Sequence, residues 1–291
     1  GAYIAHSGVT GYGEAFLKRA LGIDIGEVET MAHYRAAQFF CPDVSFILDI
    51  GGQDMKCTKV RDGYIEDIVL NEACSSGCGS FIDTFATSLR LPIEQFAKEG
   101  LLAPMPIDLG SRCTVFMNSK VKQAQKEGAT VPDIAAGLAY SVIKNALYKV
   151  LKVKDPKELG DHIVVQGGTF YNEAVLRAFE KLMGVEVIRP DVSGLMGAYG
   201  MALLASEAAE ELQNQHSSLL DVDGLKSLQV STSMRNCGLC SNNCMLTINA
   251  FSDGRTYVTG NRCDRGAGDM IQEKHKPVPN MVEVKLRRYF D

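Results

Sequence analysis

The chain has 291 residues, a formal net charge of -5 and a hydrophobic content of 46%, enough apolar material for one large or two medium domains. Its mildly acidic charge and the lack of a dense Lys/Arg run disfavour nucleic acid or an anionic membrane as a partner. No apolar run approaches the roughly 18 residues of a spanning helix, and the first residues lack a signal-peptide pattern, so a cytoplasmic protein is expected.

The N-terminal part of the chain predicts α/β structure. Residues 12–40 show helical periodicity with one short break, and residues 44–50 form a nearly continuous apolar run that predicts a buried strand. A Gly-Gly turn then leads into a second strand, and Asp62-Gly63 is typical of a β-hairpin turn. Strand, turn, strand and helix in this order indicate an α/β fold.

Further helices and strands are predicted up to residue 215. Apolar spacing predicts three helices between the hairpin and residue 152. Residues 162–184 then repeat the order of buried strand, Gly-Gly turn and helix, and residues 185–190 predict another strand. A Gly- and Ala-rich helix over residues 193–215 is suited to close packing because its side chains are small.

Two predicted strand ends carry glycine turns that suit a phosphate. The segment Asp49–Asp54 (DIGGQD) ends the first buried strand, where glycines let backbone amides approach a phosphate and carboxylates can hold Mg²⁺. Alone, this turn fits equally well a tight hairpin that needs glycine at positive φ. The second turn, at Val164–Gly168, runs into a helix, and the doubled motif suggests two loops that face one nucleotide.

The nine cysteines are unevenly spread, with four between residues 237 and 263. In a cytosolic chain this pattern suggests metal or redox chemistry rather than disulfides. Cys41 and Cys57 are expected to be small buried hydrophobic residues.

The four clustered cysteines predict a metal module. Cys237, Cys240 and Cys244 form a CxxCxxxC run, and a hairpin around Asp253-Gly254 would return Cys263 to the other three. Structural zinc usually has two CxxC pairs, whereas here the last cysteine stands alone. The pattern resembles the small iron-sulfur domain at the start of molybdopterin oxidoreductases. A second 4Fe-4S cluster is favoured, and zinc stays the alternative.

Four segments resemble, in order and spacing, the ATP-dependent activators of 2-hydroxyacyl-CoA dehydratases. These activators belong with the benzoyl-CoA reductase ATPase subunits in the actin-like ATPase group. The resemblance covers residues 8–210 and implies an α/β, actin-like ATPase (ribonuclease H-like) fold lacking its first strands, plus a small cysteine-rich β-hairpin module. The segments are DIGGQDMK, NEACSSGCGSF, CTVFMNSKV and VVQGGTFYNEAVLRAFE.

The resemblance implies four parts. Residues 1–46 would be the remnant of the first actin-like subdomain and residues 47–215 the second, with its returning C-terminal helix. Residues 216–229 would be a linker, and residues 230–291 the four-cysteine metal module, which resembles the middle portion of larger fused activase-like proteins. The chain opens on Gly1 without Met, after the family's first phosphate loop, so a fragment that binds ATP poorly is expected.

The resemblance also implies the roles of the turn residues, which would bind ATP and Mg²⁺. The catalytic group would consist of Asp49, Gln53 and Asp54. The residues that bind the cofactor would be Gly51, Gly52, Lys56, Gly77, Gly79, Gly167, Gly168 and Asn172, with Gly167, Gly168 and Asn172 against the adenosine.

Cys74 and Cys113 match the family's two cluster cysteines. A 4Fe-4S cluster takes four thiolates, so one cluster would be shared across the two-fold axis of a homodimer. The implied mechanism is ATP-driven transfer of one electron, from a ferredoxin- or flavodoxin-like donor, to a partner dehydratase or reductase component. Cys78 occupies a position at which the smaller activators of this family have a threonine. His33 and His6 are expected to pack in the protein or lie on its surface rather than to bind a metal.

Two other functions stay open. A sugar-kinase-like small-molecule kinase of the same superfamily would have no use for Cys74 and Cys113. A non-catalytic structural or regulatory module of a larger activase-like polypeptide would be consistent with the missing first phosphate loop.

Overall fold

The computed structural model describes residues 3–71, 78–111, 114–211, 216–267 and 281–290. The chain divides into two compact units, each formed by two segments. The first unit comprises Gly1–Glu14 and Ile25–His216, and the second comprises Ala15–Asp24 and Ser217–Asp291. A short N-terminal segment is thus part of the C-terminal unit.

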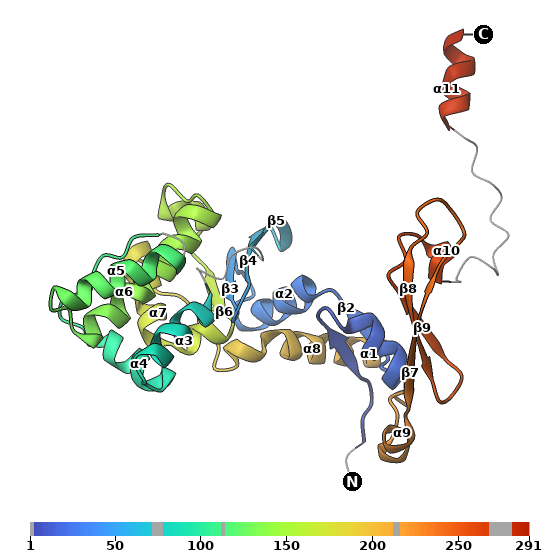
Figure 1. The fold of residues 1–291 in the computed structure, drawn as a ribbon, viewed down its shortest axis with the longest axis horizontal. Coiled ribbons are helices and arrows are strands. Elements are labelled where there is room, and N and C mark those ends of the chain that lie inside the picture. Colours follow the sequence, from blue (N-terminus) through green and yellow to red (C-terminus); the bar gives the residue numbers. More distant parts are fainter. Residues whose placement is uncertain (1–2, 72–77, 112–113, 212–215, 268–280, 291) are drawn as a thin grey trace. The chain divides into compact units, whose positions relative to one another are not determined.

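The first unit contains a four-stranded sheet with the order β5-β4-β3-β6 (Figure 1). Its strands are β3 (Phe46–Ile50), β4 (Met55–Arg61), β5 (Tyr64–Asn71) and β6 (Ile163–Gln166). β3 pairs antiparallel with β4, which pairs antiparallel with β5, whereas β3 and β6 are parallel. The carboxyl ends of β3 and β6 therefore meet at the same edge of the sheet.

All five residues of β3 are buried because both faces of the sheet are covered. Phe46, Leu48 and Ile50 belong to the larger core cluster, on one face. Ile47 points to the other face and packs in a smaller cluster with Tyr34. Burial on two sides explains why four of the five residues of this strand are apolar.

Helices supply the larger cluster on the first face. They are α3 (Gly79–Ser88), α4 (Ile93–Leu101), α5 (Thr114–Lys126), α6 (Val131–Lys144), which continues into a π-helical segment (Asn145–Val150), and α7 (Glu173–Met183). α6 begins at the N-cap Thr130, whose side chain accepts a hydrogen bond from the Asp133 amide. Short 3₁₀ turns occur at Pro156–Leu159, Gly168–Tyr171 and Ser193–Leu195.

The opposite face carries α2 (Glu29–Phe40) and α8 (Met196–Glu211). A Cβ at Gly200 of α8 would lie 1.8 Å from the carbonyl oxygen of Ala32, so these two helices pack with their backbones in contact. A two-stranded parallel sheet of β1 (Gly8–Thr10) and β2 (Ile25–Glu27) completes this side. No helix within the described ranges is long and apolar enough to cross a membrane.

The second unit is built on an antiparallel sheet. Its elements are α1 (Glu14–Leu21, all but its first residue), α9 (Val222–Ser227), β7 (Val230–Asn236), β8 (Met245–Phe251), β9 (Thr256–Thr259), α10 (Asp264–Ala267) and α11 (Met281–Phe290). The strand order is β7-β8-β9. Phe16 packs its ring 5.9 Å from Phe251 and 5.6 Å from Tyr257, and Arg255 donates a 2.6 Å hydrogen bond to the Arg19 carbonyl.

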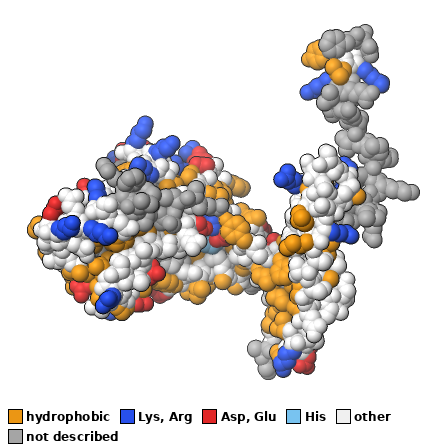
Figure 2. Space-filling model, viewed as in Figure 1, with side chains coloured by type: hydrophobic (Ala, Val, Ile, Leu, Met, Phe, Trp, Pro, Cys, Tyr) orange, Lys and Arg blue, Asp and Glu red, His pale blue; other side chains and the backbone are white. Residues whose placement is uncertain are grey.

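β7 is solvent-exposed at every residue. The side chains of Met234 and Met245 are 71% and 59% exposed, and Figure 2 shows hydrophobic side chains along this sheet. Residues 216–229, predicted as a linker, contain α9, and the Ser218 amide donates a 2.7 Å hydrogen bond to Asp24.

Several predicted elements are confirmed, and one is wrong. The strands around both Gly-Gly turns, the hairpin at Asp62-Gly63 and the hairpin at Asp253-Gly254 are present. Residues 185–190 form no strand but a single bridge between Ile188 and Val164. Pro190 has no N–H, so the ladder cannot extend in that direction. The sequence pattern does not predict β1, β2 or β7.

Candidate nucleotide site

The first glycine turn closes the β3–β4 hairpin. The Gly51 amide donates a 3.0 Å hydrogen bond to the Asp54 carbonyl. A Cβ at Gly51 would lie 2.5 Å from Asp54 Oδ1, whereas a Cβ at Gly52 would meet no atom within 4 Å. A side chain at Gly51 would therefore displace the Asp54 carboxylate, whereas the backbone of Gly52 faces open space.

The second glycine turn follows β6 and packs against the first. Gly167 has φ of +92°, and a Cβ there would lie 2.3 Å from the Ile50 carbonyl oxygen. The Gly167 amide donates to the Ser193 carbonyl at 2.8 Å, and the Ser193 hydroxyl donates to the Gly167 carbonyl at 3.0 Å. Thr169 Oγ1 donates to the Gly51 carbonyl at 2.8 Å. The two turns thus form one rigid edge.

The N-terminus of α3 is hydrogen-bonded to the first turn. The Gly79 amide donates to the Gly51 carbonyl at 2.9 Å, and the Ser80 amide donates to the Gly52 carbonyl at 2.8 Å. These bonds satisfy two of the amides that a helix N-terminus leaves without an intrahelical partner. A displacement of the turn would therefore be transmitted to α3.

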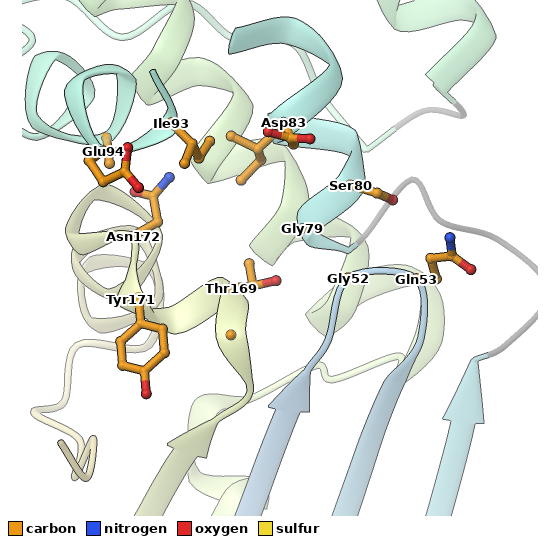
Figure 3. A pocket seen from close by; sticks show the side chains of 13 residues that line it. Gly52, Gln53, Gly79, Ser80, Asp83, Ile93, Glu94, Thr169, Tyr171 and Asn172 are labelled. Carbon is orange, nitrogen blue, oxygen red and sulfur yellow. The ribbon is translucent and has the colours of Figure 1, made fainter. Parts of the chain in front are cut away.

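Both turns open on a cavity of about 530 Å³ (Figure 3), a volume suited to a nucleotide-sized ligand. Its wall is formed by residues from the two turns, α3, α4 and the start of α7: Gly52, Gln53, Gly79, Ser80, Ile82, Asp83, Ile93, Glu94, Ala97, Gly168, Thr169, Tyr171 and Asn172. Asn172 also caps α7, because its Oδ1 accepts hydrogen bonds from the amides of Ala174 and Val175 at 3.0 and 3.3 Å.

Asp49 lies behind the turns, buried, and lines neither this cavity nor the one beside it. Its Oδ2 accepts a 3.0 Å hydrogen bond from Gln166 Nε2 and contacts His33 Nδ1. Burial raises the pKa of Asp49, but the hydrogen bonds and charge of His33, with Gln166 and Lys56, outweigh it and leave the pKa below its ordinary value. Asp49 is therefore a carboxylate at neutral pH.

Lys56 forms a second set of ionic contacts beside the turn. Its Nζ lies 2.6 Å from Glu29 Oε1 and 3.0 Å from Asp54 Oδ2. Burial lowers the pKa of Lys56, but the two carboxylates outweigh this effect and raise it, so Lys56 keeps its charge.

A second cavity of about 550 Å³ lies on the other side of Gln53, where Glu29, His33 and Asp54 also line it. Sequence reasoning missed Glu29 and assigned His33 to packing or the surface. A single histidine and a single glutamate on a helix give no pattern that indicates a site. Only the packing of α2 against the sheet brings them to the turn.

The two predicted cluster cysteines, Cys74 and Cys113, and the predicted cofactor residue Gly77 lie outside the described residues. Cys78 is fully buried at the start of α3. Cys41 and Cys57 are buried as expected, and burial raises the pKa of the Cys57 thiol to about 12.

The four C-terminal cysteines lie at one end of the β7-β8-β9 sheet, and none forms a disulfide. Cys237 and Cys244 flank the β7–β8 turn, and the Cys237 amide donates a 2.8 Å hydrogen bond to the Cys244 carbonyl. Cys240 lies within that turn, and Cys263 follows β9 at the start of α10. Four thiols at one sheet end are a donor set suited to iron or zinc. No three His, Cys, Asp or Glu side chains converge into a metal site within the described part of the chain.

Comparison with solved structures defines the class of the fold. The (R)-2-hydroxyglutaryl-CoA dehydratase component A of Acidaminococcus fermentans has a TM-score of 0.63 at 32% identity, over 71% of this chain and 77% of that chain. The activator of the 2-hydroxyisocaproyl-CoA dehydratase from Clostridium difficile with bound ADPNP has a TM-score of 0.64 at 32% identity, over 72% and 76%. The fold is therefore the mixed α/β, actin-like ATPase fold of these activators.

The chain belongs to the BadF/BadG/BcrA/BcrD ATPase family, whose profile matches residues 2–205. A further relative, the activator of lactoyl-CoA dehydratase from Anaerotignum propionicum, is 30% identical over 72% of this chain and 78% of its own length. These relatives are named as activators of 2-hydroxyacyl-CoA dehydratases, and one, from Acidaminococcus fermentans, is named as an activating ATPase. The family resemblance found in the four motifs is confirmed.

Proposed function

We propose that the protein couples ATP to one-electron transfer and so activates a 2-hydroxyacyl-CoA dehydratase or a related reductase component. The observation that carries this proposal is the pair of hydrogen-bonded glycine turns at the edge of a nucleotide-sized cavity. Gly52 and Gly168 face open space, so a bound nucleotide can approach their backbones directly. The relatives' activities and the ADPNP in one related structure support the same assignment.

Magnesium would be held beside the first turn. A bound Mg²⁺ uses one or two protein carboxylates with phosphate oxygens and waters, and it neutralises charge on the phosphates. Asp54 suits this role because its side chain is 36% exposed at the turn, and Gln53 lines both cavities. Gly52 would bind phosphate through backbone contacts, while Gly168, Tyr171 and Asn172 line the part of the cavity proposed for the adenosine.

The connection between nucleotide and electron transfer would run through α3. The segment that carries Cys74 leads directly into this helix, whose first two amides are bonded to Gly51 and Gly52. If the first glycine turn changes position with the nucleotide state, its hydrogen bonds would shift the start of α3 and with it the segment that carries Cys74. In a homodimer, Cys74 and Cys113 of both subunits would hold one 4Fe-4S cluster, which supplies a site for one electron.

The donor would be a ferredoxin- or flavodoxin-like protein, and the acceptor a dehydratase or reductase component. The four C-terminal cysteines would hold a second 4Fe-4S cluster, with zinc as the alternative. The protein would act in the cytoplasm.

Replacing Gly168 by valine is expected to block nucleotide binding without unfolding the protein. The added side chain meets no protein atom within 4 Å at its Cβ and would occupy the cavity. We expect the Kd for ATP to rise by at least about 30-fold, which corresponds to roughly 2 kcal/mol. Titration with ATP and with ADP measures the effect. Ala198→Val, which adds bulk at an exposed position of α8, is the control. ATP affinity unchanged by Gly168→Val would contradict the site.

Metal analysis separates the two predicted cysteine sites. In anaerobically purified protein, Cys74→Ala/Cys113→Ala should lower iron and sulfide by about half a 4Fe-4S cluster per chain, because the cluster is shared by two subunits. Cys240→Ala/Cys263→Ala should lower either iron or zinc, which identifies the second metal. Iron, sulfide and zinc content, together with subunit mass, provide the readout. If neither variant loses iron, the electron-transfer proposal fails.

A further inference from the structure

His33 of α2 lies where several elements meet behind the glycine turns. Its Nδ1 contacts Asp49 Oδ2 and lies 2.8 Å from Gln166 Nε2. On the other side of the ring, Nε2 lies 3.7 Å from Glu29 Oε1. A Cβ at Gly197 of α8 would be 2.7 Å from the same Nε2, so α8 approaches the ring through a glycine. The imidazole is therefore confined between α2, α8 and the sheet.

The hydrogen-bond chemistry requires a proton between His33 and Asp49. Two bare acceptors, Nδ1 and a carboxylate oxygen, would repel each other at contact distance, so Nδ1 must carry the hydrogen. Gln166 cannot then donate to Nδ1 as well. Its Nε2 donates to Asp49 instead, and its buried Oε1 has no hydrogen-bond partner among the described residues. Turning the amide over would place its oxygen against the Asp49 carboxylate. Among the described residues, His33 is thus the second side chain, beside Gln166, that contacts the Asp49 carboxylate as a hydrogen-bond donor.

Asp49 is in turn packed against the second glycine turn. A Cβ at Gly167 would lie 2.6 Å from Asp49 Oδ1, so this carboxylate lies directly under the contact between the two turns. A rotated Asp49 side chain would press on Gly167. His33 thus sets the orientation of the Asp49 carboxylate, and that orientation affects the geometry of both glycine turns.

We propose that His33 is a positioning residue that holds the Asp49 carboxylate through an Nδ1–H hydrogen bond and thereby keeps the two glycine turns in the geometry needed for ATP hydrolysis. This inference rests on the proposed function and extends it to a helix outside the four motifs. The charged groups around the ring are Glu29 on α2, Asp49 on β3, and Lys56 and Asp54 beside the first turn.

A matched pair of substitutions tests the role. The amide nitrogen of asparagine takes the place of Nδ1, whereas that of glutamine takes the place of Nε2. His33→Gln and His33→Ala should each lower kcat for ATP hydrolysis about 10- to 100-fold, with KM changed less than about threefold, because a hydrogen bond to a charged group is lost. His33→Asn should stay within about threefold of wild type. His162→Ala, which removes an exposed His–Asp pair, is the control.

Equal loss of kcat in the Asn and Gln variants, or no loss in either, would overturn the proposal. The second measurement does not depend on activity. Long-range ¹H–¹⁵N spectra of the ¹⁵N-histidine-labelled wild type are recorded, and the His33 signals are assigned as those that are missing in His33→Asn. We expect the proton on Nδ1 and its signal shifted in Asp49→Ala. An Nε2–H tautomer with bare Nδ1 would overturn the proposal, even in a protein that hydrolyses ATP. If the wild type does not bind ATP even weakly, the proposed function is refuted instead, and the spectrum would still decide the role of His33.

Discussion

Replacing Gly167 by alanine is expected to lower the free energy of unfolding by roughly 3 kcal/mol or more. At φ of +92° and ψ of 156° the backbone is in a region that is nearly restricted to glycine. The new Cβ would also lie 2.3 Å from the Ile50 carbonyl oxygen and 2.6 Å from Asp49 Oδ1. These are backbone and buried atoms that cannot move aside cheaply. Urea unfolding followed by circular dichroism measures the loss.

The neighbouring glycine provides the control. Gly168→Ala adds the same methyl group in open space and should change stability by less than about 0.5 kcal/mol. If both alanine variants are equally stable, the two turns do not pack as described.

Replacing Asp49 by asparagine should destabilise the protein by about 3 kcal/mol at pH 7, because His33 and Gln166 lose a buried carboxylate as their hydrogen-bond acceptor. The pKa of Asp49 is lowered in the folded state, mainly through hydrogen bonds and charges that outweigh burial. Its stabilisation is therefore fully present above the unfolded pKa of about 3.9 and is lost as the pH falls through the folded pKa. The difference between wild type and variant should be constant near neutrality and shrink below about pH 4.

Unfolding free energies measured between pH 7 and pH 3 give this profile. Asp108→Asn is the comparison, because Asp108 pairs with Lys144 at 2.8 Å but its side chain is 77% exposed. It should cost less than about 1 kcal/mol. A difference for Asp49→Asn that grows on acidification would show that the pKa is raised rather than lowered.

Local chemistry made much of the sheet and both turns predictable. The run from Phe46 to Ile50 is apolar at all but one position because β3 is covered on both faces, and Asp62-Gly63 suits the left-handed conformation of a hairpin turn. β2 could not be predicted in this way. Its three residues form a strand only because β1 pairs beside them.

The sequence by itself determined the family, the two Gly-Gly turns and the placement of four cysteines at the same end of a predicted hairpin. These features depend on glycine's conformational freedom, on apolar periodicity and on residue spacing, all of which act locally. The tertiary structure alone decided that His33 and Glu29 of α2 adjoin the turn, that Gln166 binds Asp49, and that residues 15–24 belong with the C-terminal unit. Such contacts join residues distant in the chain, and they arise from the packing of whole helices against a sheet, which no local pattern encodes.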